Sequence, residues 1–538
     1  MMAAMKFKCS FDKAQYLSNE PVRIRLPYGL AIDKISITRL ESTVEAEMTC
    51  SDEEVCITGL PDGAYGVKIE SRGLAWEGAF DIVGDRRDAV RYGFLTDFGV
   101  EDMGSDDVEW MRDLHINTVQ FYDWMYRHDQ LLPPGRQYED PMGRKMDIET
   151  VKEKISSCRE LGMRPMAYGA VYAATGETAQ KHPDWVMYTM DGTPMKFADW
   201  LYFMNISSGS CWTDHLMAEY RAAIGLGFAG IHMDTYGFPK RVWDSSGHPV
   251  ELGSEFPALI NRASCEVRLV DASAGVIFNA VNNWPVDTVA ASKQDVVYIE
   301  VWPPNDTYLD LYRLICRARE LSGKNVVLAA YMKPFKEDDL LAAERSFRLT
   351  WAAICASGGT QLALGEYMGI LRDSYYVDYA RLTEDFSKVV QKYCDFLVRY
   401  SELLYNDKGT DISKTASGGI NEDVCFSGSC TFSTDGGEDA VWTIIRESEK
   451  RTTINLVNLT NNSCLWNESK REPKHVTDIN IRLRLDRQVR GVYAASPDFD
   501  ELGAMELSFS SKESCQGRVY SIDVPELRYW AVIWIQLE

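Results

Sequence analysis

The stretch Gly230-Ile-His-Met-Asp234-Thr-Tyr236 is an apolar, strand-like run that ends on one carboxylate, with an aromatic residue two positions later. A second run has the same form, Asp295-Val-Val-Tyr-Ile-Glu300-Val-Trp302. Burying a carboxylate at the end of a strand costs free energy unless the charge is paired, so an unpaired one there indicates a function. The two runs therefore predict buried parallel strands whose ends carry a functional carboxylate pair, as in the acid/base pairs of glycosidases.

Apolar strand-like segments alternate with helical patterns on both sides of these runs. Eight such segments can be counted: Tyr92–Asp97, Ile116–Asp123, Arg164–Tyr172, Gly230–Tyr236, Gly275–Asn282, Val296–Trp302, Val326–Met332 and Thr360–Glu366. The helical patterns include Ile148–Leu161, Cys211–Gly225, Tyr308–Leu321, Leu340–Ala356 and a last one from about Asp378 to Leu404. Eight alternating units are typical of a (β/α)8 TIM barrel, which we expect over residues 89–405. The active site of this fold lies at the carboxyl ends of the strands, so the polar residues there should meet in one pocket.

Two regions with a different pattern flank the predicted barrel. Residues 1–88 contain short alternating runs, such as Val22-Arg-Ile-Arg-Leu26, separated by turns such as Pro61-Asp-Gly63. This pattern predicts a small antiparallel β-sandwich of immunoglobulin-like size. Residues 406–538 return to strand-like runs, such as Tyr529-Trp-Ala-Val-Ile-Trp-Ile535, and predict a second antiparallel β domain. The expected fold class is therefore multidomain α/β, with a central barrel between two β domains.

The composition narrows the class of partner. The 538 residues carry a formal net charge of -23, with a pI near 4.9, which argues against nucleic acid and anionic membranes as partners. The segment Met1–Ser10 shows no apolar signal-peptide core, so we expect a cytoplasmic location, or secretion if the chain was trimmed. The 13 scattered cysteines are expected to be reduced thiols. The sequence leaves the oligomeric state open.

Asp234 and Glu300 are the expected catalytic pair. In a barrel they lie two strands apart at the same depth, and Tyr298 and Trp302 offer apolar surroundings that raise the pKa of Glu300. A structural alternative stays open for each carboxylate. Asp234 would then cap a loop or pair with Lys240 or Arg241, and Glu300 would bridge to Arg313 or Lys333.

The second predicted strand has an unusual ending, Gln120-Phe-Tyr-Asp-Trp-Met-Tyr-Arg-His128. Aromatic rings stack on sugars, and Asp123 is placed to hold a pair of hydroxyl groups, so we expect Tyr122, Asp123, Trp124 and His128 to bind substrate. The alternative is an aromatic core with a solvated loop. Weaker binding candidates stand at the other strand ends: Asp97, Tyr168, Tyr172, Asn282, Trp302, Tyr331 and Glu366.

Other chemistries find little support in the sequence. His232 and Asp234 would make half of a metal site, but the first strand, Tyr92-Gly-Phe-Leu-Thr-Asp97, carries no HxH pair. A nucleophile elbow, a dinucleotide-binding loop and a Walker loop are all missing from the sequence. We therefore expect neither a metal nor a cofactor.

Four motifs resemble glycoside hydrolase family 66, which contains dextranases and cycloisomaltooligosaccharide glucanotransferases. They are Tyr92-Gly-Phe-Leu-Thr-Asp-Phe98, Gln120-Phe-Tyr-Asp-Trp124 with Arg127-His128, Gly230-Ile-His-Met-Asp234 and Val297-Tyr-Ile-Glu300-Val-Trp302. The resemblance implies an immunoglobulin-like domain, a (β/α)8 barrel and a Greek-key β domain. It also implies retaining cleavage of α-1,6-glucosidic bonds in dextran or isomaltooligosaccharides, with Asp234 as nucleophile, Glu300 as acid/base and Asp123 as a substrate-holding residue.

The resemblance leaves a choice between hydrolysis and transfer. Cyclising members carry a carbohydrate-binding module after the seventh strand, whereas Met332 to Thr360 leaves room here only for a helix, so hydrolysis is favoured. The alternatives are a cycloisomaltooligosaccharide glucanotransferase or another α-1,6-transglucosylase. A non-catalytic sugar-binding protein would be expected to lack Asp234 or Glu300, and both are present.

Overall fold

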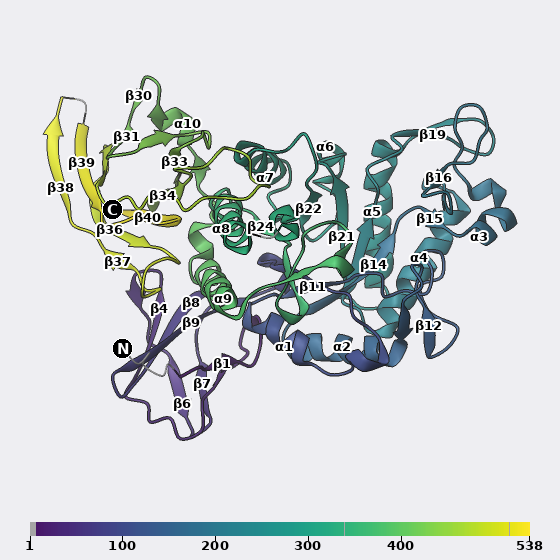
Figure 1. The fold of residues 1–538 in the computed structure, drawn as a ribbon, viewed down its shortest axis with the longest axis horizontal. Helices are drawn as coiled ribbons and strands as arrows, with labels where there is room; N and C mark the ends of the chain where they lie inside the picture. The colour runs from purple at the N-terminus through teal and green to yellow at the C-terminus, as the bar shows by residue number, and fades with distance from the viewer. Residues whose placement is uncertain (1–6, 338, 516) are drawn as a thin grey trace.

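A curled sheet of eleven strands forms the centre of the molecule, in the order β24-β23-β22-β21-β18-β14-β11-β10-β25-β26-β27 (Figure 1). The computed structural model describes residues 7–337, 339–515 and 517–538. The first six residues, which belong to the predicted N-terminal domain and to the segment in which no signal peptide is predicted, lie outside it. The parallel strands are β10 (Tyr92–Leu95), β11 (Thr118–Phe121), β14 (Arg164–Ala170), β18 (Gly230–Asp234), β21 (Gly275–Val281), β22 (Val297–Glu300), β23 (Val326–Ala329), β24 (Thr360–Gln361) and β25 (Leu364–Gly365). β26 (Gly369–Ile370) and β27 (Ala380–Arg381) continue the sheet in antiparallel pairing.

The eighth predicted strand is divided into two short pieces. β24 pairs in parallel with β23 through Val327 and Thr360, whereas β25 pairs in parallel with β10 through Phe94 and Gly365. The segment from Thr360 to Gly365 therefore contacts both edges of the parallel series, and the sheet curls so that its first and seventh strands share this neighbour.

Alternate residues of the parallel strands point into the centre of the curled sheet. Their side chains form one buried cluster that includes Tyr92, Phe94, Met166, Ile277, Val296, Tyr298 and Val327. Because side chains alternate between the two faces of a strand, Asn279 shares the inward face with Ile277, and Glu300 shares it with Tyr298. The strand pattern thus fixes which polar residues face the centre.

Helices join the strands. They are α1 (Asp106–Asp113), α2 (Ile148–Glu160), α4 (Cys211–Leu226), α5 (Leu252–Arg268), α6 (Val286–Val289), α7 (Tyr308–Ser322), α8 (Leu340–Ala356) and α9 (Glu384–Arg399). Four of them (α2, α4, α7 and α8) match the ranges predicted from the sequence to within one residue at either end. The predicted start of the last helix at Asp378 is wrong. Tyr376–Asp378 forms a 3-10 turn, and α9 begins only after Thr383, whose hydroxyl accepts a hydrogen bond from Phe386 N at 3.2 Å.

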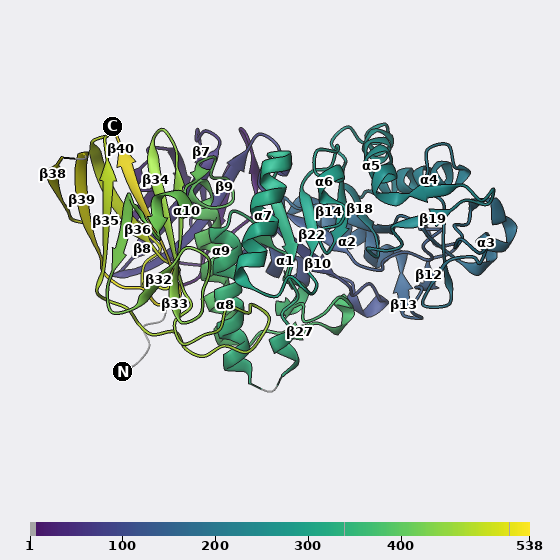
Figure 2. The ribbon, with the colours of Figure 1, turned by 90° about the horizontal axis from the view of Figure 1, so that it is seen from above.

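Two longer excursions extend the carboxyl ends of the strands. After β14 the chain forms β15 (Ala173–Ala174), α3 (Gly176–Lys181), β16 (Lys196–Phe197) and β17 (Leu201–Phe203). After β18 it forms a hairpin of β19 (Arg241–Trp243) and β20 (Pro249–Glu251). Figures 1 and 2 show both excursions at the end of the molecule farthest from the two chain termini.

The N-terminal region forms two sheets around its own apolar core. One has the order β1-β3-β7-β6, with β1 (Ser10–Phe11), β3 (Val22–Arg25), β7 (Glu54–Thr58) and β6 (Glu47–Cys50). The other has the order β2-β9-β8-β4-β5, with β2 (Tyr16–Leu17), β9 (Leu74–Val83), β8 (Gly63–Ser71), β4 (Lys34–Arg39) and β5 (Ser42–Thr43). The pairing is antiparallel except between β2 and β9. The immunoglobulin-like assignment and its boundary at residue 88 stay predictions.

The C-terminal region also consists of strands. Its main sheet contains β28 (Thr410–Asp411), β32 (Thr431–Ser433), β33 (Ala440–Glu447), β34 (Arg451–Asn458), β40 (Trp530–Leu537), β36 (Val489–Ala495) and β37 (Met505–Glu506). A second sheet contains β31 (Val424–Ser427), β35 (Ile479–Leu485), β39 (Gly517–Val524) and β38 (Phe509–Ser514). The main sheet packs on α9, where Phe396 meets Trp530 edge-on with ring centroids 4.9 Å apart. The Greek-key assignment and the boundary at residue 406 stay predictions.

A buried ion pair joins the N-terminal sheets to the central sheet. Arg91, which precedes β10, donates two hydrogen bonds of 2.9 Å to the carboxylate of Asp81 on β9. The same guanidinium group donates to the hydroxyl of Tyr405 at 3.0 Å and to the carbonyl oxygen of His115 at 2.6 Å. Both charged side chains are at most 5% exposed, so the pair depends on these bonds to offset its loss of hydration.

No helix within the described part of the chain is both long and apolar enough to cross a bilayer.

Candidate active site

Asp234 ends β18 and receives two hydrogen bonds at its carboxylate. The hydroxyl of Tyr168 on β14 donates to Oδ2 at 2.8 Å, and the side-chain amide of Asn279 on β21 donates to Oδ1 at 2.7 Å. Burial, assisted by the nearby charge of Glu300, raises the pKa of Asp234 to about 7. Asp234 does not pair with Lys240 or Arg241, the alternative left open by the sequence. Arg241 pairs with Glu251, and Lys240 lies over the ring of Trp284.

Glu300 ends β22 and is bonded in the same way. The hydroxyl of Tyr331 donates to Oε1 at 2.7 Å, and the amide of Asn279 donates to Oε2 at 3.1 Å. The residue is 9% exposed, and its burial raises the pKa of the carboxyl group. Arg313 instead pairs with Asp310. Glu300 is therefore a buried carboxyl group held by neutral donors.

Asn279 connects the two carboxylates through a single nitrogen atom. Each hydrogen of its NH2 group serves one of them, so the two acceptor oxygens lie no farther apart than the two bonds laid end to end, about 5.8 Å. Two buried carboxyl groups this close titrate as a pair, which favours one ionised and one protonated member near neutral pH. The arrangement supplies a nucleophile or base and an acid within one small site.

The sequence did not single out Asn279. Asn282, which stands at the predicted end of that strand, is the residue that the sequence predicts for the site. Asn282 instead binds the loop after β22: its amide nitrogen donates to Pro303 O at 2.9 Å, and its oxygen accepts from Asn305 at 2.6 Å. Strand periodicity is the signal that was available, since Asn279 lies two residues after the inward-facing Ile277.

A chain of tyrosines lies behind Glu300. The hydroxyl of Tyr376 lies 3.4 Å from that of Tyr331 and 3.1 Å from that of Tyr298. Tyr376 comes from the turn after β26, which no sequence pattern marked as part of the site. Its ring stacks on Tyr122 at a centroid separation of 4.5 Å, so one face of Tyr122 is covered by protein.

Asp123 and His128 each carry a polar group that has no hydrogen-bond partner among the described residues. Asp123 has a φ of 49°, and its carboxylate receives no hydrogen bond from another described residue, although Arg144 binds its backbone oxygen at 3.3 Å. Burial raises its pKa to about 7. The Nδ1 atom of His128 is buried and unbonded among the described residues, and burial lowers the pKa of this side chain to about 4. Each residue thus keeps a polar group unsatisfied among the described residues.

Three other sequence candidates are bonded within the protein. Trp124 is fully buried and donates to the carbonyl oxygen of Tyr168 at 3.2 Å, so its ring packs in the core. The hydroxyl of Tyr172 accepts from Tyr236 N and donates to Phe238 O, which fixes the loop after β18. Glu366 is fully buried and accepts hydrogen bonds from the backbone of Thr96 and Asp97, which fixes the end of β10.

Asp97 itself lies beside this bonded group. Its carboxylate accepts a hydrogen bond of 3.4 Å from the hydroxyl of Tyr379, and its charge contributes, after burial, to the raised pKa of Glu366, about 8. His232, two residues before Asp234 on β18, is buried, and its Nδ1 is bonded to the hydroxyl of Tyr92 at 2.9 Å. Within the described residues, no group of three or more His, Cys, Asp and Glu side chains is arranged to hold a metal ion.

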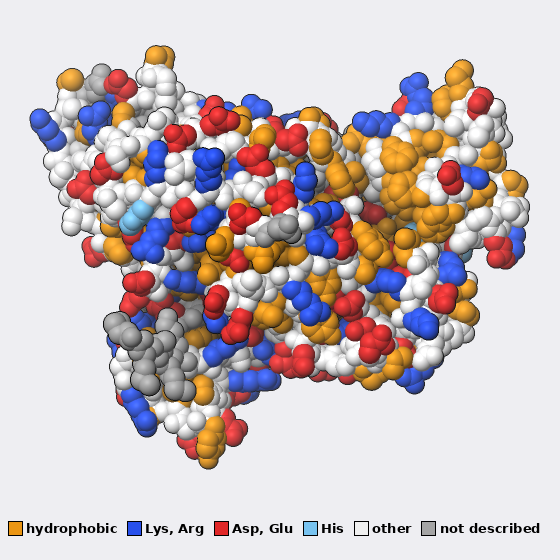
Figure 3. Space-filling model, viewed as in Figure 1, with side chains coloured by type: hydrophobic (Ala, Val, Ile, Leu, Met, Phe, Trp, Pro, Cys, Tyr) orange, Lys and Arg blue, Asp and Glu red, His pale blue; other side chains and the backbone are white. Residues whose placement is uncertain are grey.

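A cavity of about 420 Å³ opens beside Glu300, and four of its nine lining residues are aromatic. Its lining includes Phe197, Tyr236, Lys240, Trp284, Glu300 and Trp302. Trp302 is 37% exposed and meets Tyr331 edge-on at 5.9 Å, whereas the rings of Phe197 and Tyr236 stack at 4.4 Å. Hydrophobic side chains gather on the surface over the region of β15, β16 and β19 (Figure 3). Exposed rings next to a carboxyl pair are suited to sugar faces.

Two curated relatives are similar to most of this chain. A cycloisomaltooligosaccharide glucanotransferase of Niallia circulans is 23% identical over 634 residues, covering 88% of this chain and 64% of the relative. A dextranase of Streptococcus salivarius is 21% identical over 515 residues, covering 80% of this chain and 60% of the relative. The chain thus spans less than two thirds of the length of these relatives.

A solved structure shows the same fold. The crystal structure of a Paenibacillus sp. cycloisomaltooligosaccharide glucanotransferase, complexed with cycloisomaltoheptaose, superposes with a TM-score of 0.88 at 20% identity, covering 99% of this chain and 100% of that one. The sequence profile of glycosyl hydrolase family 66 matches residues 64–534. Because this match spans most of the chain, the protein belongs to glycosyl hydrolase family 66.

Proposed function

We propose that this chain is a retaining glycoside hydrolase that cleaves α-1,6-glucosidic linkages in dextran or isomaltooligosaccharides. The observation that carries the proposal is the carboxyl pair formed by Asp234 and Glu300, joined through Asn279 within about 5.8 Å. Retaining glycosidases hold their two carboxyl groups roughly 5–5.5 Å apart, whereas inverting enzymes need a wider gap for a water molecule. Family membership and the dextranase relative support the choice of substrate.

In the first half-reaction, ionised Asp234 attacks the anomeric carbon while protonated Glu300 gives its proton to the leaving glycosidic oxygen. A β-glucosyl-enzyme forms, and the rest of the glucan leaves as an alcohol. Tyr168 and Asn279 hold the attacking carboxylate, and both donors favour its ionised form. Burial keeps the proton on Glu300.

In the second half-reaction, Glu300 acts as a base. Now ionised, it takes a proton from water, which attacks the anomeric carbon and releases Asp234 and an α-configured product. Tyr331 and Asn279 donate hydrogen bonds to this anionic form of Glu300. Asp123 and His128 bind hydroxyl groups of the donor sugar, and Trp302 lies where a leaving or accepting sugar passes.

Hydrolysis is favoured over cyclisation by the segment between β23 and β24. It holds a 3-10 turn (Lys333–Lys336) and α8, and the described part of this segment contains no other helix or strand. The aromatic cavity beside Glu300 favours the second candidate, an α-1,6-transglucosylase, because exposed rings next to the acid/base can bind an acceptor sugar instead of water. The proposal includes the closed (β/α)8 form of the sheet, supported by the pairing of the segment Thr360–Gly365 with both β23 and β10.

Product analysis on dextran and on linear isomaltooligosaccharides tests the proposal. We expect wild type and the control Asp385→Ala, altered at an exposed residue of α9, to release short linear products. Asp234→Ala and Glu300→Ala should lose activity by about four to six orders of magnitude. Cyclic or elongated products would show that the chain is a transferase and not a hydrolase. If no α-1,6-glucan reacts, the proposed substrate class is wrong.

Azide rescue separates the two roles. In Asp234→Ala, azide takes the place of the nucleophile and should yield a β-glucosyl azide from an activated α-glucosyl donor. In Glu300→Ala, azide attacks the glucosyl-enzyme and should yield the α-anomer. The opposite pair of anomers would exchange the two roles, and inverted products from wild type would exclude the double displacement.

A further inference from the structure

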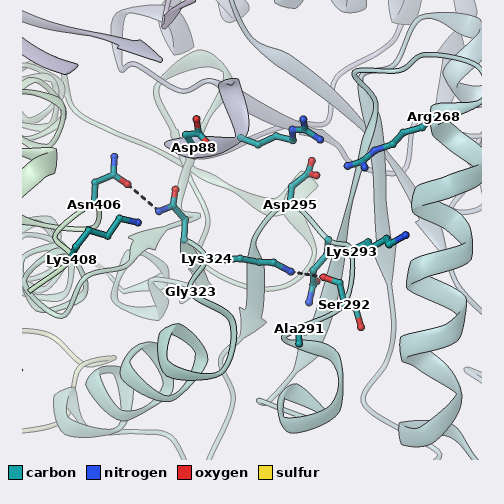
Figure 4. A pocket seen from close by; sticks show the side chains of 13 residues that line it. Asp88, Arg268, Ala291, Ser292, Lys293, Asp295, Gly323, Lys324, Asn406 and Lys408 are labelled. Atoms are coloured by element: carbon teal, nitrogen blue, oxygen red, sulfur yellow. Dashed lines mark hydrogen bonds between the residues drawn. The ribbon is translucent and has the colours of Figure 1, made fainter. Parts of the chain in front are cut away.

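A second cavity, of about 750 Å³, lies at the opposite ends of the parallel strands from Asp234 and Glu300. We call it the basic cavity. Its walls are short segments that precede strands or join domains, and they carry Arg87, Asp88, Arg268, Ser292, Lys293, Asp295, Lys324 and Lys408 (Figure 4). Asp295 and Glu300 are five residues apart on one extended segment, roughly 16 Å at the rise of a β-strand. The basic cavity is therefore separate from the catalytic pair.

The lining of the basic cavity is positively charged in a strongly acidic protein. Five cationic residues (Arg87, Arg268, Lys293, Lys324, Lys408) face two carboxylates (Asp88, Asp295), whereas the whole chain carries a formal charge of -23. Figure 4 shows Arg268 and Lys408 reaching in from opposite sides, with Asp295 between them. A local surplus of cations against the sign of the whole chain indicates a place where anions accumulate.

The carboxylate at the centre of this cavity is already paired. Asp295 binds Arg164 at 2.5 Å, and both side chains are at most 6% exposed. The other arm of Arg164, Nη1, is buried and has no hydrogen-bond partner among the described residues. Asp295 therefore does not balance the remaining cations. Arg164 also lines a smaller neighbouring cavity of about 270 Å³, together with Arg86, Arg87 and Arg159.

Most of the cations have no carboxylate partner. Arg87 is held by Asp85, but Arg268, Lys293, Lys324 and Lys408 form no ion pair with any described residue. Lys324 donates to the carbonyl oxygens of Ala290 and Ser292, and Arg268 donates to that of Ala274 at 3.2 Å, so both are oriented by the backbone. Two cations oriented by the backbone and two exposed lysines without an ion pair among the described residues leave positive charge free for a ligand.

We propose that the basic cavity binds a small phosphorylated molecule. Arginine and lysine together recognise a phosphate dianion, the former by paired donors and the latter as a point charge. The volume lies within the range of small-molecule sites, roughly 300–1,000 Å³, and exceeds what one inorganic phosphate fills. The expected ligand is a phosphomonoester of a polar molecule, such as a phosphorylated sugar.

Calorimetric titration tests this proposal, with glucose 6-phosphate as the probe and glucose, inorganic phosphate and sulfate as comparisons at fixed ionic strength. We expect saturable binding of glucose 6-phosphate and no binding of glucose. The double variant Lys293→Gln/Lys408→Gln should weaken binding at least tenfold, as should Arg268→Gln. The control Lys388→Gln, which removes an exposed cation on α9, should bind like wild type.

Two results would overturn the basic cavity as a site. One is equal, weak binding of sulfate, phosphate and glucose 6-phosphate, the behaviour of general ionic attraction. The other is unchanged affinity in both cavity variants, whose altered side chains are exposed and whose folding is checked by circular dichroism. The titration is repeated on Glu300→Ala, so the result is independent of the proposed hydrolase activity.

Discussion

The hydroxyl of Tyr331 donates a 2.7 Å hydrogen bond to Oε1 of Glu300. This bond stabilises the ionised carboxylate and thereby opposes the effect of burial, which raises the pKa of Glu300. The segment that follows β23 thus helps to set the protonation state of the proposed acid/base.

Removing this bond should shift the pH profile. In Tyr331→Phe the ionised form of Glu300 loses a donor, so its pKa rises further and the protonated form persists to higher pH. We expect the alkaline limb of kcat/KM to move upward, and the optimum value to fall about tenfold, as for a hydrogen bond to a charged group. Tyr312→Phe, altered on α7 where the hydroxyl binds Asp411, is the control. An unmoved or lowered alkaline limb would contradict the role of Tyr331.

Asn279 and Asn282 form a matched pair of substitutions. Asn279→Ala removes the donor shared by both carboxylates and should lower kcat by about 100-fold or more, as for loss of one preorganised donor. Asn282→Ala loosens the loop that carries Trp302 and should act mainly on KM. Steady-state kinetics with dextran measure both. If the two variants lose kcat equally, the shared-donor role of Asn279 is wrong.

Asp123 predicts a pH dependence of substrate binding. Its pKa of about 7 means that its carboxylate ionises as the pH rises through neutrality, and only the ionised form accepts hydrogen bonds at both oxygens. KM of wild type should therefore fall between about pH 6 and 8. In Asp123→Asn we expect KM to be about tenfold higher and flat across this interval. A sloping KM in this variant would assign the dependence to another group, and Asp385→Asn serves as the control.

The junction between the N-terminal sheets and the central sheet should be costly to disrupt. Asp81→Asn leaves Arg91 buried without its counter-charge, and we expect a loss of about 3–5 kcal/mol in the free energy of unfolding. Glu384→Gln, at an exposed ion pair on α9, should cost at most about 1 kcal/mol. Urea unfolding followed by circular dichroism compares them. Equal losses would show that the buried pair contributes little.

The sequence predicted the series of parallel strands because each strand is a short apolar run bounded by polar residues. It also predicted where Asp234 and Glu300 meet, since both stand at carboxyl ends of strands in one sheet. The sequence predicted less well which residues bind these two carboxylates. Position at a strand end predicts Asn282 and not Asn279. Strand alternation, by contrast, places Asn279 on the inward face and Asn282 off it.

Tertiary contacts decided the rest of the site. Tyr376 reaches Tyr331 and Tyr298 from a turn remote in sequence, and no local pattern predicts such a contact. Trp124 is buried against Phe228, with ring centroids 4.6 Å apart. The start of α9 was detectable, because Thr383 followed by Glu384 and Asp385 is a typical helix N-terminus. The cellular location and the domain boundaries remain predictions.

The single amide of Asn279 has a consequence for engineering. Because each carboxylate keeps a second donor of its own, removing Asp234 still leaves Glu300 bound by both Asn279 and Tyr331. Under the proposed mechanism, a variant without the nucleophile thus retains an oriented general base next to an emptied space on the other face of the sugar. Such a variant can couple a glycosyl fluoride of inverted configuration to an acceptor sugar. Because the nucleophile is missing, the new linkage is not cleaved again. The chain is therefore a suitable starting point for a glycosynthase.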